Sequence, residues 1–127
     1  MSENKKLSKF KAVILFRITE IMLKASLEET FRTYGVEITY ASDVSELEKN
    51  LQSSANRINC LVICDLILAR NELDALVEVS KNKLGVKILG FYPHINTEIR
   101  SKAKVSRIDY VVPRSNLITK IKELLAA

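Results

Sequence analysis

The sequence contains few of the residues that mark cofactor loops and disulfide frameworks. Its 127 residues include three glycines, two prolines, two cysteines, one histidine and no tryptophan. The glycines stand alone at positions 35, 85 and 90, so no glycine-rich loop is present that could hold a phosphate or a dinucleotide. We therefore expect no flavin, no nicotinamide and no other cofactor.

The two cysteines, Cys60 and Cys64, lie four positions apart in an apolar run. On a strand they would share one face but would be too far apart for a disulfide. Without a histidine or cysteine partner at ligand spacing they also make a poor zinc site. We expect two buried thiols and no metal. His94 has no cysteine or acidic neighbour, so we expect it to hydrogen-bond within its loop, with a contact to a pocket as the alternative.

No apolar stretch is long enough to span a bilayer, and the N-terminus lacks the apolar segment of a signal peptide. We therefore expect a cytoplasmic chain that does not bind membranes. The composition, 47% hydrophobic and 28% charged with a net charge of +5, is that of a globular protein. Residues 1–10 read as a basic N-terminal lead-in and residues 11–127 as a single domain.

Short apolar runs alternate with longer amphipathic stretches along the chain. The apolar runs predict strands at residues 12–16, 36–40, 58–66, 86–91 and 110–112. The amphipathic stretches predict helices at residues 20–34, 43–51, 71–84, 97–107 and 115–125. Gly35 and Gly85 would close the first and third helices, while Ser42 or Asp43 would cap the second and Asn96 or Thr97 the fourth.

Strands that alternate with helices indicate βαβ units, and hence a parallel sheet with right-handed crossovers. The predicted fold class is α/β, a three-layer αβα sandwich around a five-stranded parallel sheet. By analogy we expect the flavodoxin-like strand order 2-1-3-4-5. The run at 58–66 is the most apolar and should be central, whereas the run at 36–40 alternates and should be less buried.

Ligands of such sheets bind at the carboxyl ends of the strands, where the strand order reverses. The polar residues there, with the aromatic Tyr92, are our candidates for a ligand pocket: Arg17 and Glu20, Asp65, Tyr92 and His94, Arg114 and Ser115. Asp65 directly follows the most buried strand and is the candidate nucleophile, or else it caps the next turn or pairs with Arg17 or Arg114. Ser115 could cap the last helix and, with Arg114 and Arg17, hold an anion. We prefer an internal pair between Arg114 and Asp65, because a lone buried carboxylate is costly.

Two segments carry a resemblance to a known family. Residues 60–66, Cys-Leu-Val-Ile-Cys-Asp-Leu, are similar to the third strand of response-regulator receiver (CheY-like) domains, whose last aspartate accepts a phosphoryl group. Residues 108–114, Ile-Asp-Tyr-Val-Val-Pro-Arg, are similar to their fifth strand. The resemblance covers nearly the whole chain in the order and length of its elements. It implies a two-component signalling domain.

The departures from this pattern indicate a degenerate, or pseudo-receiver, member. Receivers carry an acidic pair after the first strand that holds Mg²⁺, and residues 17–20, Arg-Ile-Thr-Glu, offer one useful acid. The switch threonine or serine falls on Phe91, and the lysine that pairs with the phosphoryl group falls on Pro113. We therefore expect Asp65 to be a vestigial phosphoacceptor and the chain not to be an enzyme.

The resemblance then implies a signalling or adaptor domain that acts by binding a protein. In receivers, the surface formed by the fourth helix, the fifth strand and the last helix binds partners or a second protomer. Arg100, Lys104 and Tyr110 are our interface candidates there, and a homodimer through this surface is an alternative. A phosphoacceptor using Asp65 and a sensor binding a small anion are the rival functions. Nucleic-acid binding is not expected, because the chain has no helix-turn-helix, zinc finger or interleaved aromatic residues.

Overall fold

The computed structural model describes residues 10–52, 59–81, 85–93 and 97–126. Its five strands are β1 (Ala12–Phe16), β2 (Glu37–Ala41), β3 (Cys60–Asp65), β4 (Val86–Tyr92) and β5 (Tyr110–Pro113). Its five α-helices are α1 (Ile21–Thr33), α2 (Val44–Gln52), α3 (Leu73–Lys81), α4 (Thr97–Val105) and α5 (Leu117–Ala126), with a 3₁₀ turn, η2 (Arg114–Asn116), before α5. The alternation of strands and helices is as the sequence predicts.

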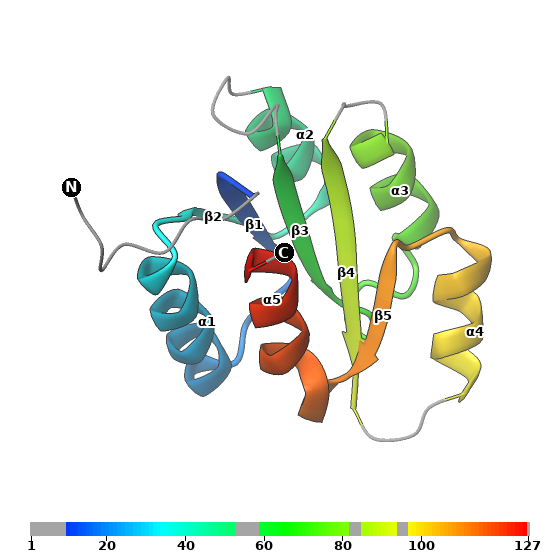
Figure 1. The fold of residues 1–127 in the computed structure, drawn as a ribbon. Coiled ribbons are helices and arrows are strands. Elements are labelled where there is room, and N and C mark those ends of the chain that lie inside the picture. Colours follow the sequence, from blue (N-terminus) through cyan, green and yellow to red (C-terminus); the bar gives the residue numbers. More distant parts are fainter. Residues whose placement is uncertain (1–9, 53–58, 82–84, 94–96, 127) are drawn as a thin grey trace.

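The strands form one parallel sheet in the order β2-β1-β3-β4-β5 (Figure 1). The α/β class and the expected strand order are therefore confirmed. The β3 strand is central and buried until its last residue, because its run of apolar side chains is covered on both faces. The β2 strand lies at the edge of the sheet and is less buried, as predicted, since only Ala41 of its five residues is buried.

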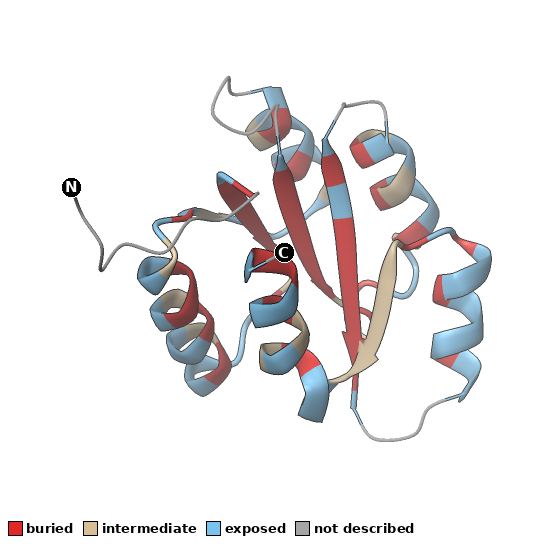
Figure 2. Cartoon of the chain, viewed as in Figure 1, coloured by how far each residue is buried: buried red, intermediate tan, exposed pale blue. Residues whose placement is uncertain are grey.

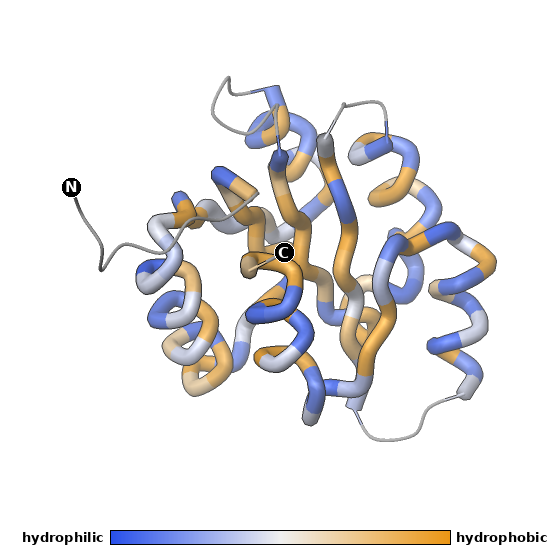
Figure 3. The backbone as a smooth tube through the Cα atoms, viewed as in Figure 1, coloured by the Kyte–Doolittle hydropathy of each residue, from blue (hydrophilic) through white to orange (hydrophobic). Residues whose placement is uncertain are grey.

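Two apolar cores lie on opposite faces of the sheet, one under α1 and α5 and the other under α2, α3 and α4. Figure 2 shows the buried strands between the helical layers, and Figure 3 shows that hydrophobic and hydrophilic residues alternate along the helices. Each strand contributes side chains to both cores, since successive side chains point to opposite faces of the sheet. Cys60 and Cys64 are fully buried in the same core, as predicted.

The predicted helix ends are partly confirmed. Gly35 follows Tyr34, the C-cap of α1, and has a φ angle of 69°, the left-handed conformation that glycine adopts freely. Gly85 has a φ angle of 79°, but residues 82–84 before it lie outside the described residues, so its closing of the third helix stays a prediction. Asp43 is the cap of α2, since its Oδ1 accepts the backbone N–H of Glu46 at 2.8 Å. The Ser115 cap is wrong. Pro113 holds the capping position of η2 without a side-chain bond, and Ser115 lies inside the turn.

Residues 1–9 of the predicted N-terminal lead-in and His94 lie outside the described residues. Phe10, the last residue of that lead-in, is 3% exposed and packs in the core under α1 and α5. The alternative Asn96 cap of α4 also falls outside them. In the described part of the chain, no helix has both the length and the apolar character needed to cross a membrane.

Candidate functional site

A pocket of about 250 Å³ opens at the carboxyl edge of the sheet, where β1, β3, β4 and β5 end. It is lined by Ile18, Thr19, Glu20, Leu23, Asp65, Ile67, Leu68, Phe91, Pro93 and Arg114. Three of the predicted pocket residues are among these, Glu20, Asp65 and Arg114. The edge is the one that the parallel topology predicts for a ligand.

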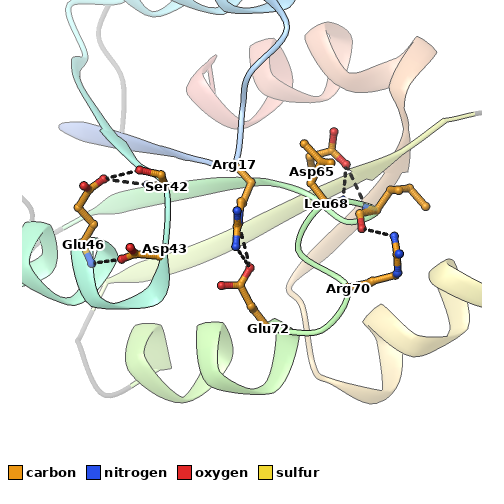
Figure 4. A network of polar contacts seen from close by, with 9 residues as sticks. Arg17, Ser42, Asp43, Glu46, Asp65, Leu68, Arg70 and Glu72 are labelled. Atoms are coloured by element: carbon orange, nitrogen blue, oxygen red, sulfur yellow. Dashed lines mark hydrogen bonds and ion pairs between the residues drawn. The ribbon is translucent and has the colours of Figure 1, made fainter.

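Asp65 is half-buried at the end of β3, beside Phe91 of β4. Its Oδ1 accepts hydrogen bonds from the backbone N–H groups of Ile67 and Leu68, at 3.0 and 3.2 Å (Figure 4). The carboxylate therefore caps the turn that follows β3, which is one of the alternatives that the sequence left open. Among the described residues, no donor reaches Oδ2 of this carboxylate.

Arg114 does not pair with Asp65, so the preferred internal pair is wrong. Its guanidinium donates instead to Oε1 of Glu20, at the capping position of α1. This hydrogen bond lowers the pKa of Glu20 and raises that of Arg114, because it stabilises both charged forms. The acid that lines the pocket together with Asp65 is thus held by an arginine.

Arg17, which follows β1, does not line the pocket. Its Nε and Nη2 donate to Oε1 of Glu72 at 2.9 and 2.8 Å, and Figure 4 shows the side chain directed away from Asp65. The φ angle of Arg17 is 61°, a left-handed conformation that costs a non-glycine residue about 1 kcal/mol. The predicted Arg17–Asp65 pair is therefore also wrong.

The remaining pocket candidates fall elsewhere. Tyr92 is 6% exposed and packs in the core under α2, α3 and α4, because it follows Phe91 on β4 and so points to the opposite face. Ser115 is exposed in η2 and is not part of the pocket lining. Neither residue belongs to the site.

Sequence reasoning missed the apolar part of the lining, at Ile18, Leu23, Ile67, Leu68 and Pro93. A signal was present, since Ile18 and Ile67 lie two positions after the ends of β1 and β3, at the edge where the strands end. We considered only polar side chains and aromatic Tyr92 there, and that choice hid the pocket's mainly apolar character.

The residues at this edge do not fit a magnesium ion. Magnesium requires several oxygen ligands in near-octahedral geometry. Asp65 supplies one carboxylate, and Glu20 is already paired with Arg114. Within the described ranges, no three histidine, cysteine, aspartate or glutamate side chains are grouped closely enough to hold a metal ion.

The two thiols of β3, Cys60 and Cys64, are not nucleophiles. Burial raises the pKa of Cys60 to about 12, and burial with the nearby Asp65 and Glu72 carboxylates raises the pKa of Cys64 further. The reactive thiolate is therefore suppressed at neutral pH.

The interface candidates lie at the other edge of the sheet. Arg100 and Lys104 are exposed on α4, while Tyr110 is half-buried on the edge strand β5. The ammonium group of Lys120, on α5, lies 5.1 Å from the centre of the Tyr110 ring. The phenol ring is thus held against α5 rather than projecting freely.

No family model and no curated protein sequence matches the chain. Solved structures do match it. A response regulator from Thermotoga maritima has a TM-score of 0.71 at 11% identity, over 93% of this chain and 99% of that one. The chemotaxis protein CheY4 from Vibrio cholerae has a TM-score of 0.67 at 17% identity, over 91% and 99%.

A response regulator from Burkholderia pseudomallei, described with a phosphorylated aspartic acid, a calcium ion and citrate, has a TM-score of 0.68 at 13% identity. The match covers 91% of this chain and 66% of that protein. At such identities the likeness is one of fold, and the chain has the flavodoxin-like fold of response-regulator receiver domains.

Proposed function

We propose that this domain with a receiver fold is a cytoplasmic, non-catalytic signalling or adaptor module, which binds a protein without Mg²⁺-dependent phosphorylation of Asp65. The observation that carries the proposal is the ion pair between Glu20 and Arg114 at the rim of the pocket. Among the described residues, it removes from metal binding the only carboxylate besides Asp65 that lines the pocket.

Phosphoryl transfer depends on positive charge placed around the transferring group, chiefly a metal ion and a lysine. The receiver position of that lysine is Pro113, which has no charge, and Arg114 is engaged by Glu20. Each lost charge removes several kcal/mol of transition-state stabilisation, at about 1.4 kcal/mol per tenfold in rate. The loss of these charges supports a domain that acts by binding a partner protein.

The partner surface that we propose comprises α4, β5 and α5. Exposed basic residues gather on and after α4, at Arg100, Lys102, Lys104 and Arg107. They favour an acidic partner protein, since opposite charges speed encounter and fix orientation. A homodimer through the same surface is the alternative, and sedimentation of wild-type protein beside an Arg100→Glu/Lys104→Glu variant separates the two.

The rival functions have weaker support at this site. A small anion in the pocket would meet the Asp65 and Glu20 carboxylates, and Arg114, the one cation in the described part of the lining, is already paired. A phosphoacceptor role would need Asp65 to react without the acidic pair and the lysine. The basic residues of α4 are not accompanied by the aromatic stacking residues that nucleic-acid surfaces use.

The experiment is incubation of the whole chain with acetyl phosphate and Mg²⁺, followed by intact-mass measurement. We expect no phosphoryl adduct, in the wild type or in Asp65→Asn. An active receiver domain, treated in parallel, must show the adduct for the assay to count. A stoichiometric adduct on the wild type that is absent from Asp65→Asn would contradict the proposal.

A further inference from the structure

Exposed apolar side chains surround the pocket. Ile21 and Met22, in the first turn of α1, are 81% and 75% exposed, and Leu68, after β3, is 48% exposed. The residues before and after the α1 pair, Glu20 and Leu23, line the pocket, as does Leu68 itself. We call these three side chains, together with the apolar lining of the pocket, the strand-end surface. Figures 2 and 3 show the first turn of α1 as hydrophobic and partly exposed.

Single exposed apolar residues are ordinary, but a group beside an apolar pocket marks an interaction site. The first turn of α1 has no acidic residue, although the helix dipole favours an acid there. Ile21 and Met22 therefore occupy positions where a solvent-facing helix would gain from charged side chains.

The charge of the pocket indicates what the surface accepts. Glu20 and Arg114 form an ion pair, so the described lining carries one net negative charge, at the Asp65 carboxylate. Its Oδ1 is occupied by two backbone N–H groups, and within the described chain its Oδ2 accepts no hydrogen bond. The free oxygen is suited to a cationic donor, and it lies in apolar surroundings that strengthen such a bond.

The size of the pocket favours a polypeptide over a free small molecule. Sites that enclose a drug-sized ligand measure roughly 300–1,000 Å³, and this pocket measures about 250 Å³. Ile21 and Met22 lie outside its lining, so a ligand confined to the pocket would leave them in water. A side chain anchored in the pocket, on a segment that continues over α1, would cover both.

We infer that the strand-end surface binds a segment of a partner protein that inserts a large apolar side chain into the pocket and sets a lysine or arginine against Asp65. This surface is separate from the one formed by α4, β5 and α5. The inference rests on the proposed function in one respect, namely that Asp65 is not a phosphorylation site.

The test is selection from a random peptide library on the immobilised whole chain, with affinities then measured in solution. We expect selected peptides to carry a large apolar residue within four positions of a lysine or arginine. Their affinity should fall at least tenfold for Met22→Ser/Leu68→Ser and severalfold for Asp65→Asn. Because the two serine changes are at exposed positions, the fold should persist, and circular dichroism checks this.

The matched control is Val105→Ser. Val105 is 80% exposed on α4, far along the chain from the strand-end surface, so this variant removes a similar apolar side chain elsewhere. It should leave the affinity of the selected peptides unchanged. Amide shifts of the labelled chain on peptide addition should concentrate at residues 18–23 and 65–68.

Several outcomes would overturn the inference: no enrichment, acidic peptides, or equal binding to Met22→Ser/Leu68→Ser and wild type. So would a concentration-dependent dimer abolished by the same variant, which assigns the surface to a second copy. If phenethylamine bound in the pocket and left a selected peptide in place on α1, the pocket would be assigned to a small amine. The acetyl phosphate assay is independent, since an adduct contradicts the proposed function whatever the peptides do.

Discussion

Asp65 owes its role to the groups around it rather than to its residue type. A carboxylate at the end of a central strand is a nucleophile when a metal ion and a lysine face it. Here one of its oxygens caps a turn, and Arg114, which lines the same pocket, is paired with Glu20. The pairing of Arg114 is therefore the residue-scale feature on which the proposed function depends, and it can be measured directly.

Replacing Arg114 by glutamine should raise the pKa of Glu20 toward its ordinary value of 4.5, because the hydrogen bond that stabilises the carboxylate is lost. A lowered folded pKa means that the pair contributes stability above the unfolded pKa and loses it as the pH falls through the folded value. Carboxyl shifts of Glu20 in an NMR titration give the pKa. Arg32→Gln, at the other end of α1, is the control and should change nothing. Equal midpoints in all three proteins would show that the pair does not form in solution.

The sequence predicted the position of the pocket and not its internal pairing. Topology alone brings the strand ends together, so Asp65, Glu20 and Arg114 were found at one edge. Whether Arg114 pairs with Glu20 or with Asp65 depends on where α1 begins and how its first turn is oriented. No local sequence pattern specifies that orientation. The error on Tyr92 was avoidable, because alternation from Phe91 places it in the opposite core.

At the scale of elements, the strands and most helices followed from periodicity and from glycine positions. The third helix was predicted to begin at residue 71, and α3 begins at Leu73, since Glu72 donates its backbone N–H to Ala69 in a turn before the helix. Its predicted end at residue 84 lies outside the described residues. The last helix was predicted to begin at Ser115, where the chain instead makes the 3₁₀ turn η2. Such ends depend on hydrogen bonds to the preceding loop, which the sequence pattern does not specify.

Gly90 on β4 provides an element-scale prediction, because it allows the loop after β3 to pack on the sheet. A Cβ at this position would lie 2.5 Å from Cδ2 and 2.8 Å from Cγ of Leu66, which is fully buried. Gly90→Ala should therefore lower the free energy of unfolding by about 1–3 kcal/mol, as overpacking does. Urea unfolding followed by circular dichroism measures the change.

The control for Gly90→Ala is the double variant with Leu66→Ala, which removes the atoms in conflict. Leu66→Ala alone should cost about 2–5 kcal/mol. The double variant should be more stable than the sum of the two losses implies, by about 0.5–3 kcal/mol. Strictly additive losses would mean that Leu66 does not restrict the space beside Gly90.

At the scale of the whole molecule, the two cores lie on opposite faces of one sheet. Each strand contributes alternate side chains to both, so neither face can lose its order while the other keeps a complete sheet. A chain of this size that buries its core in this way is expected to unfold as one cooperative unit.

Two mild truncations test this, one in each core. Ile88 on β4 packs under α2, α3 and α4, and Ile121 on α5 packs on the other face, both fully buried. Each change to valine should cost about 0.5–1.5 kcal/mol, and the losses should add within about 0.5 kcal/mol because the side chains share no contact. Far-ultraviolet circular dichroism and tyrosine fluorescence should give one coincident urea transition for all variants. If Ile121→Val shifted the fluorescence transition away from the dichroism transition, the face under α1 and α5 would unfold separately, and a partner bound at the strand-end surface could then act by ordering that face alone.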